Sequence, residues 1–284
     1  MLSRWSGSSK GSGNQVEDAM SVAAVLLVKD EFDVIKDVIT HLQNNVDEVI
    51  VQDNASTDGT REILETLDVM VIDDPEVGYW QSRKTTALAM TAMHRGHTWV
   101  LPCDSDEIIY ATDGRSISDF LGGIPPDVQI INAELYNHLP TSLDPPEVDE
   151  NGIRRSVFER IGWRQRNHAP MGKVACRLHQ DLVIHAGNHS ASLPGMSLIG
   201  AGLCVRHFSW REPGQYLKKI RNGQAAYRET DLPENIGVHW RMFENSTDEA
   251  IIDHFHQWFY YADPKVDHTL IYDPAPVNLI SDVG

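Results

Sequence analysis

Three acidic side chains follow an apolar run near the middle of the sequence. The run Trp99-Val-Leu-Pro-Cys103 is typical of a buried strand, and Asp104, Asp106 and Glu107 come directly after it. Like charges in one turn cost free energy unless a cation lies between them or solvent screens them. At the carboxyl end of a parallel strand, where ligands bind to open α/β sheets, a divalent cation that bridges to a diphosphate explains such a turn. A solvated acidic turn is the alternative.

The segments before this turn alternate short apolar runs with helical periods. We expect strands at 22–28, 48–52, 69–72 and 99–102 and helices at 33–42, 61–67 and 82–95. This order predicts an α/β fold with a Rossmann-like, mostly parallel, twisted sheet flanked by helices. The first turn has Lys29-Asp30-Glu31 in place of Gly-x-Gly-x-x-Gly, which argues against an NAD or FAD domain.

Beyond the acidic turn the pattern is less regular. Ser116 resembles the cap of a short helix, and residues 128–135 read as a strand. Residues 137–172 are irregular, as functional lids and binding loops often are. The remaining expectations are a hairpin formed by 173–178 and 182–185, a strand at 203–210, a basic-faced helix at 215–227 and a final helix at 248–261.

Composition limits the possible partners and the compartment. The 284 residues carry a formal net charge of −17, which disfavours nucleic acids and anionic membranes as partners. Three widely spaced cysteines are neither a disulfide framework nor a zinc pattern, so we expect a cytoplasmic protein. No apolar run approaches the roughly 20 residues that cross a bilayer. Residues 1–20 read as a flexible Ser/Gly arm.

Three motifs in this order resemble those of the family 2-like glycosyltransferases with the GT-A fold. They are Val25-Leu-Leu-Val-Lys-Asp-Glu31, Val49-Ile-Val-Gln-Asp-Asn-Ala-Ser-Thr-Asp-Gly-Thr60 and the acidic turn with its Asp-x-Asp. The later Arg206-His-Phe-Ser-Trp-Arg211 is similar to the closing segment of that superfamily. The resemblance spans about residues 22–227 and implies a donor-binding half at 21–136 and an irregular acceptor-binding half at 137–232 in the same GT-A domain. A C-terminal helical extension is expected at 233–284, outside the resemblance.

The resemblance also implies roles for individual residues. Asp106 would be the direct ligand of Mn²⁺ or Mg²⁺, with Asp104 at the metal, its water or the ribose, and His207 completing the metal shell. Glu107 would support them, or be a surface acid. The nucleotide-sugar would be contacted by Asp30, Glu31, Asp53, Asn54, Ser56, Lys84, Asp104, Ser105 and Arg211. For several of these, capping, turn formation or a solvated helix face is the alternative.

The residue that deprotonates the acceptor is left open by the sequence. An inverting transferase needs a carboxylate or histidine at the acceptor hydroxyl. The candidates are Glu134, Glu159, Asp181, His189 and Glu212, of which His189 and Glu212 are carried forward with Asp106 as catalytic residues. His189 is also the rival of His207 as a metal ligand, and His138 and His168 are weaker candidates.

The expected function is transfer of a sugar from a nucleoside-diphosphate donor, dependent on a metal and with inversion. The acceptor is a saccharide, a protein or a lipid-linked carrier. The alternatives are a sugar-nucleotidyltransferase, an inactive nucleotide- or glycan-binding module of the same fold, and a transferase that modifies DNA bases through the basic segment 154–166. The expected donor is a nucleotide-sugar, and the oligomeric state is open.

Overall fold

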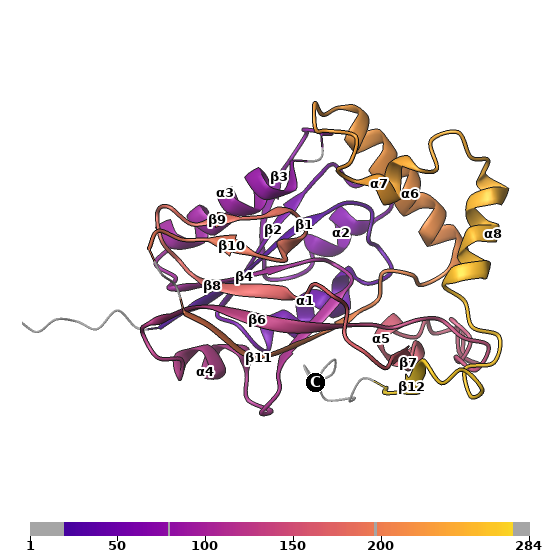
Figure 1. The fold of residues 1–284 in the computed structure, drawn as a ribbon, viewed down its shortest axis with the longest axis horizontal. Coiled ribbons are helices and arrows are strands. Elements are labelled where there is room, and N and C mark those ends of the chain that lie inside the picture. The colour runs from indigo at the N-terminus through magenta and orange to yellow at the C-terminus, as the bar shows by residue number, and fades with distance from the viewer. Residues whose placement is uncertain (1–19, 79, 196–197, 275–284) are drawn as a thin grey trace, which may run out of the picture.

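Eight strands form one twisted sheet in the computed structural model, which describes residues 20–78, 80–195 and 198–274 (Figure 1). The strand order is β3-β2-β1-β4-β8-β6-β11-β5. The bounds are β1 Val22–Val28, β2 Glu48–Asp53, β3 Met70–Asp73, β4 Trp99–Cys103, β5 Glu107–Ala111, β6 Val128–Asn137, β8 Lys173–Arg177 and β11 Leu198–His207. Neighbours among β1 to β4 are parallel, as are β6 and β11, whereas β8 and β5 run antiparallel to their neighbours. The expected α/β class is confirmed, with a mixed sheet.

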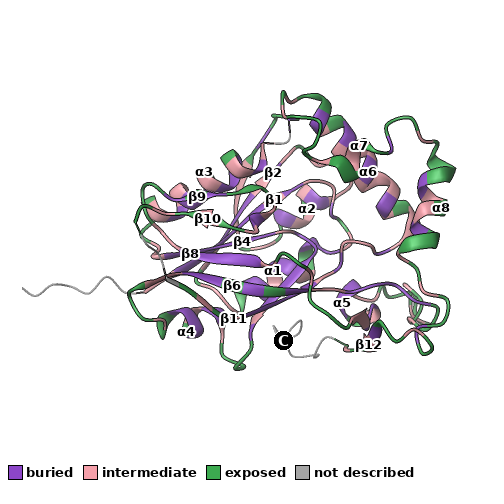
Figure 2. Cartoon of the chain, viewed as in Figure 1, coloured by how far each residue is buried: buried purple, intermediate pink, exposed green. Residues whose placement is uncertain are grey.

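Helices cover both faces of this sheet, because its central strands are apolar on both sides. In β1, Val22, Ala24 and Leu26 pack into one cluster, while Ala23 and Val25 pack into the other (Figure 2). The first cluster includes α1 Ile35–Gln43, α2 Thr60–Leu64, α4 Ile117–Gly122 and α5 Val157–Arg160. The second includes α3 Gln81–His94 and the hairpin of β9 Val183–Ile184 with β10 Ala191–Ser192.

The hairpin expected from 173–178 and 182–185 is wrong. Strand β8 lies between β4 and β6 and pairs with both, whereas β9 pairs with β10. Residues 173–176 are buried, which suits a central strand better than a surface hairpin. Gly172 permits the approach to β6, because a Cβ on it would lie 2.0 Å from the carbonyl oxygen of Ala133.

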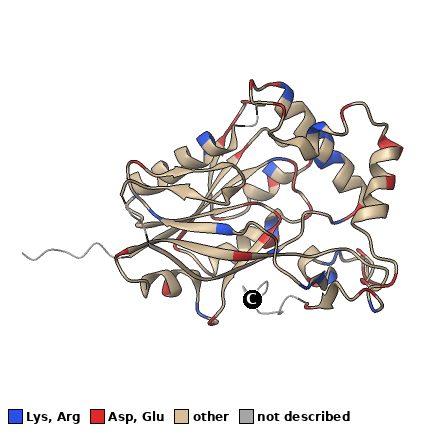
Figure 3. Ribbon diagram, in the orientation of Figure 1, with Lys and Arg blue, Asp and Glu red and all other residues tan. Residues whose placement is uncertain are grey.

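The C-terminal segment forms a smaller apolar cluster beside the sheet. Its helices are α6 Pro213–Arg228, α7 Val238–Arg241 and α8 Asp248–Trp258, and α6 carries several Lys and Arg side chains (Figure 3). Strand β12 Leu270–Tyr272 pairs with β7 Trp163–Gln165, and a 3₁₀ turn spans Ala186–Asn188. No helix among the described residues is long and apolar enough to cross a membrane. The predicted arm 1–20 lies outside the described residues except for Met20.

Candidate active site

A cavity of about 620 Å³ opens where β1, β4 and β11 end, between α3, the 3₁₀ turn and α6. Nine of the predicted site residues line it: Asp30, Glu31, Asn54, Lys84, Asp104, Ser105, Asp106, His189 and His207. Carboxyl ends of parallel strands meet at one edge of a sheet, which brings the three sequence motifs together. Four predicted site residues, Asp53, Ser56, Arg211 and Glu212, do not line this cavity.

Asp53 is the last residue of β2, and Ser56 lies in the loop that follows it. Asp53 is buried, and its carboxylate accepts from the backbone N–H of Ser56 at 3.2 Å. The Ser56 hydroxyl in turn accepts from the N–H of Asp30 at 2.9 Å. Asp30 has a positive φ of 54°, a conformation that Asp tolerates better than most residues. The loop after β2 therefore fixes the strained end of β1, and any contact of Asp53 with a nucleotide stays a prediction.

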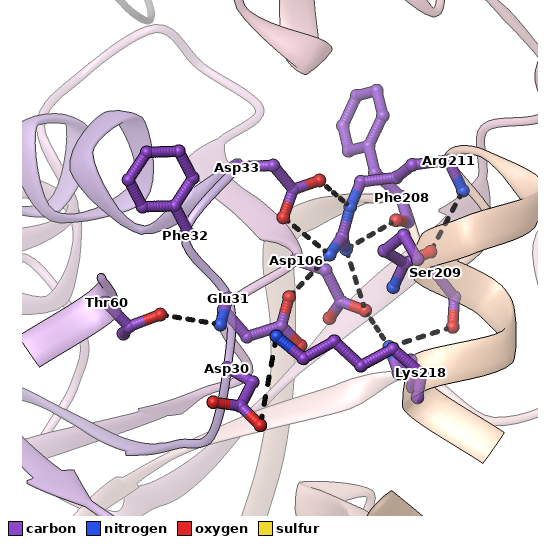
Figure 4. A network of polar contacts seen from close by, with 12 residues as sticks. Asp30, Glu31, Phe32, Asp33, Thr60, Asp106, Phe208, Ser209, Arg211 and Lys218 are labelled. Carbon is purple, nitrogen blue, oxygen red and sulfur yellow. Dashed lines mark hydrogen bonds and ion pairs between the residues drawn. The ribbon is translucent and has the colours of Figure 1, made fainter. Parts of the chain in front are cut away.

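Arg211 is fully buried and stands at the centre of a network of ion pairs (Figure 4). Its guanidinium contacts Glu31 at 2.5 Å, Asp33 at 2.6 Å and Asp106 at 3.8 Å. Burial opposes the charge of Arg211, but the Glu31 and Asp33 carboxylates hold its pKa above the usual range. Arg211 thus joins the end of β1 to the acidic turn.

Asp106 is 2% exposed and is surrounded by cations. Its Oδ2 pairs with the ammonium of Lys219, and Arg211 lies 3.8 Å away. Burial raises the pKa of Asp106, but the charges of Lys219, His207 and Arg211 overcome it and hold that pKa far below its usual range. The surrounding cations therefore favour the ionised form of Asp106.

The other oxygen of Asp106 faces His207. Asn137 donates its Nδ2 to Gln165 Oε1 at 3.0 Å, which orients the Asn137 Oδ1 toward His207 Nδ1 at 2.8 Å. With its proton on Nδ1, His207 presents the lone pair of Nε2 to Asp106 Oδ1 at 3.7 Å. Burial lowers the pKa of His207 to about 4, which keeps the ring neutral. Two electron-pair donors that face each other in this way suit a cation between them.

Asp104 and Glu107 are held by a second lysine. The ammonium of Lys173 lies 2.5 Å from Asp104 Oδ2 and 2.8 Å from Glu107 Oε1. Asn188 donates to the other Asp104 oxygen at 3.1 Å. Burial, with the neighbouring carboxylates of Asp104 and Asp106, raises the pKa of Glu107 to about 8. Among the described residues, no group of three or more His, Cys, Asp and Glu side chains is arranged to hold a metal, so Asp104 does not join Asp106 and His207.

Lys84 of α3 also lines the cavity. Its ammonium contacts Asp74 Oδ2 at 2.6 Å, and the Asn54 amide donates to the same carboxylate at 3.0 Å. Lys84, in the first turn of α3, therefore links the loops after β2 and β3. It lines the cavity, as predicted for a phosphate partner, while its charge is already shared with a carboxylate.

The two candidates for the acceptor base lie in different cavities. His189 lines the large one, and its Nδ1–H donates to the carbonyl of Gly172 at 2.7 Å. Burial lowers the pKa of His189, so its Nε2 carries a lone pair. Glu212 lines a separate cavity of about 270 Å³ with Arg160, Pro213 and Tyr260. Burial raises the pKa of Glu212. Only His189 of this pair faces the space that holds Asp106.

Sequence reasoning missed the residues that hold the acidic turn in place. Lys173 was expected in a hairpin and Lys219 on the solvated face of a helix, and Asn137 and Asp33 were not singled out. A lysine that begins an otherwise apolar run, as Lys173 begins residues 173–176, is the one signal that could have marked a buried counter-ion. Lys219 carries no such signal, because its neighbours in α6 include other cations.

Comparison with known proteins identifies the class. The family described as glycosyl transferase family 2 matches residues 24–166, half of the chain. The chain therefore belongs to glycosyl transferase family 2, a family of sugar-transferring enzymes, as the three motifs predict. The basic segment 154–166 lies within this region, and its Arg154 and Arg164 pair with Glu147 and Asp273.

Among curated relatives, uncharacterized glycosyltransferases of Rickettsia prowazekii (strain Madrid E) and Rickettsia typhi (strain ATCC VR-144 / Wilmington) are each 38% identical over 86 residues. These matches cover 30% of this chain and 28% of each relative, so the chain spans less than a third of the length of the relatives it matches.

Solved structures with partial similarity include two sugar-phosphoglycerate synthases. Glucosyl-3-phosphoglycerate synthase from Mycobacterium tuberculosis, in complex with Mn²⁺, UDP and glucosyl-3-phosphoglycerate, is 24% identical with a TM-score of 0.32, over 41% of this chain and 44% of that chain. Mannosyl-3-phosphoglycerate synthase from Rubrobacter xylanophilus is 22% identical with a TM-score of 0.31, over 41% of this chain and 40% of that chain.

Proposed function

We propose that this protein transfers a sugar from a nucleoside-diphosphate donor to an acceptor, and that Asp106 and His207 hold a divalent cation, Mn²⁺ or Mg²⁺, for the reaction. The observation that carries the proposal is the pair of Asp106 Oδ1 and His207 Nε2, 3.7 Å apart at a wall of the large cavity. The bound cation would act as a Lewis acid on the leaving diphosphate. The Asp106 carboxylate suits both Mn²⁺ and Mg²⁺, and the His207 imidazole favours Mn²⁺ of the two.

The donor is proposed to lie along the ends of β1 and β4. Asp30, Glu31 and Asn54 line this part of the cavity, together with Ser105 of the acidic turn. Lys84 supplies a cation there, and Asp104, held by Lys173, supplies an acceptor for a sugar or ribose hydroxyl. Arg211 acts indirectly in this proposal, since it positions Glu31 and Asp106 and does not line the cavity.

His189 is proposed as the base that takes the proton of the acceptor hydroxyl, with inversion at the sugar. Its Nδ1–H is fixed by the Gly172 carbonyl, and its Nε2 is free to accept a proton. Gly172 also precedes Lys173, so one close approach to β6 positions both the base and the counter-ion of Asp104. Glu212, in the other cavity, is the less suitable candidate.

The other proposals follow from the same site. A saccharide, a protein or a lipid-linked carrier can each supply the acceptor hydroxyl. The buried, free thiols of Cys103, Cys176 and Cys204 support a cytoplasmic location. The presence of a proposed metal pair, Asp106 and His207, and a proposed base, His189, in one cavity disfavours an inactive binding module. The pairing of Arg154 and Arg164 with acids disfavours DNA modification.

A thermal-shift screen tests the donor and the cation together. Nucleoside diphosphates and their sugars are compared with and without Mn²⁺, and a matching donor raises the melting temperature through linked binding. Donor hydrolysis is then measured with the ligand found. Chelator is expected to suppress hydrolysis and added Mn²⁺ to restore it. Full hydrolysis in excess chelator would contradict the proposed role of the metal. Binding of a donor without any hydrolysis would favour the inactive binding module.

A further inference from the structure

Each aspartate of the acidic turn pairs with one lysine from a distant part of the chain. Asp104 pairs with Lys173 of β8, and Asp106 pairs with Lys219 of α6. The two lysines differ in their exposure and in their number of contacts, and this difference indicates different roles for them when a ligand binds.

Lys173 is enclosed. Its side chain is 4% exposed, and besides Asp104 its ammonium contacts Glu107 Oε1 at 2.8 Å and the Gly187 carbonyl at 2.9 Å. Three acceptors on three sides match the three protons of an ammonium group. Moving this lysine would leave a buried charge without a partner, so Lys173 is a permanent counter-ion.

Lys219 is held less firmly. Its side chain is 23% exposed and borders the cavity, and its ammonium contacts Asp106 Oδ2 and, at 3.2 Å, the hydroxyl of Ser209. Lys219 extends from α6 to Asp106, and both residues line the cavity in which the donor is proposed to bind. The long, flexible side chain of lysine lets the ammonium move to another anion in the same cavity while its backbone stays in place.

We propose that Lys219 is an exchangeable counter-ion, which neutralises Asp106 in the free protein and moves to the diphosphate when a divalent cation binds Asp106. The inference rests on the proposed function, because it concerns the same site. An ammonium group and a divalent cation on one carboxylate repel each other strongly in a buried setting. The donor brings two phosphates into the cavity that Lys219 lines, so the displaced ammonium has an anion within the same space.

The first measurement is the binding of Mn²⁺ alone, followed by electron paramagnetic resonance without nucleotide. Lys219→Met removes the competing charge, and we expect it to bind Mn²⁺ about tenfold tighter than the wild type. Lys219→Arg keeps the charge and should bind no tighter than the wild type. Arg228→Met is the matched control, because Arg228 lies on the same helix, pairs with Glu244 and does not line the cavity.

The second measurement is the binding of inorganic pyrophosphate in excess chelator, followed by calorimetry. Without metal, Lys219 is expected to supply attraction for the diphosphate, so Lys219→Met should bind pyrophosphate about tenfold more weakly. Arg228→Met should match the wild type. Opposite signs in the two titrations are the mark of an exchangeable counter-ion, because general loosening of the site would weaken both ligands.

Two results overturn the inference: Mn²⁺ affinity in Lys219→Met that is equal to or below that of the wild type, or pyrophosphate affinity that does not fall. Circular dichroism establishes that the variant is folded, and Lys219→Gln replaces it if Lys219→Met is not. If the wild type transfers no sugar but the two shifts are opposite, the proposed function fails and the counter-ion role stands. If the wild type is active and the shifts are missing, the counter-ion role alone fails.

Discussion

A cluster of buried carboxylates is tolerable in this protein because three cations pair with it, of which Lys173 and Arg211 are buried and Lys219 is partly exposed. Arg211 pairs with Glu31 and Asp33, Lys219 with Asp106, and Lys173 with the rest of the acidic turn. Breaking a buried ion pair by removal of one partner costs more than the pair contributes, since the remaining charge is left without a counter-ion. At the scale of the residue, binding and stability are therefore coupled in this site.

Asp106→Asn is expected to lower donor hydrolysis by at least about a hundredfold, because the proposed cation loses its carboxylate ligand. The same change should lower the free energy of unfolding by about 3 kcal/mol, because Lys219 and Arg211 lose a charge partner. Hydrolysis kinetics and urea unfolding measure the two effects.

Asp33→Asn is the control for Asp106→Asn. Asp33 also pairs with Arg211 but does not line the cavity, so its loss should reduce stability and leave most of the hydrolysis. Equal loss of activity in both variants would show that Asp106 acts through stability alone.

His189→Ala is expected to lower kcat for transfer by about a hundredfold and to leave donor affinity close to that of the wild type. Glu212→Gln, in the separate cavity, should keep kcat near the wild-type value. Steady-state kinetics with an acceptor found by screening decides between them. A reversal of the two effects would move the base to Glu212.

The residues of the acidic turn were predicted from the sequence, but their burial was not. The sequence left a solvated acidic turn as the alternative, whereas Asp106 is 2% exposed. The reason lies in Lys219 and Arg211, which are more than a hundred residues further along the chain and carry no local pattern that links them to Asp106. Sequence periodicity reports which face of a segment is apolar, and it does not report long-range charge pairing.

At the scale of the element, the first four strands were predicted from local sequence patterns, whereas β5 and β8 were missed. The first four strands were predicted within a residue or two, because each is a short apolar run and the first three are each followed by a helical period. Strand β5, which begins at Glu107 inside the acidic turn, was missed because its first residue is charged. Strand β8 was assigned to a local hairpin, although its partners β4 and β6 lie earlier in the chain.

Gly202→Ala tests the irregularity in β11. The register of β11 against β6 shifts between Ala201 and Leu203, and Gly202 there has a φ of 131°. A Cβ at Gly202 would lie 2.5 Å from the ring of Phe120 in α4. The substitution is expected to cost about 2 kcal/mol in the free energy of unfolding. Gly96→Ala is the control, since Gly96 has a φ of 93° with nothing within 4 Å of the added Cβ. An equal cost in both variants would mean that the contact with Phe120 is unimportant.

Asp273→Asn tests the attachment of the segment that follows β12. Asp273 pairs with Arg164 at 2.5 Å and Arg206 at 3.0 Å, and although burial opposes it, these cations hold the pKa of Asp273 below its usual value. The charge of Asp273 thus stabilises the protein above the unfolded pKa of about 3.9, and this stabilisation is lost as the pH falls through the lower folded pKa. We expect the variant to be about 1 kcal/mol less stable at pH 7. The gap to the wild type should narrow below about pH 4, and urea unfolding at pH 7 and pH 3 measures it. A gap that is constant with pH would exclude the charge as its cause.

At the scale of the whole molecule, strands from the first and second halves of the sequence alternate in one sheet. The strand β8 separates β4 from β6, and β11 separates β6 from β5. The predicted donor-binding and acceptor-binding halves therefore share one sheet and the apolar clusters on both of its faces.

Residues 20–136 expressed alone are accordingly expected to lack a cooperative unfolding transition. The fragment would expose the edges of β4, β5 and β6 that β8 and β11 cover in the full chain. Thermal melts followed by circular dichroism, with the full chain as the reference, measure this. A sharp transition in the fragment would show that the donor-binding half folds on its own.

The link between Arg211 and Glu31 spans 180 positions of the chain. During synthesis on the ribosome, Glu31 in the loop after β1 is translated long before Arg211, the cation with which it pairs. A nascent chain that ends before Arg211 therefore holds the buried Glu31 carboxylate without its cation, so the end of β1 is completed only after residue 211 has been translated.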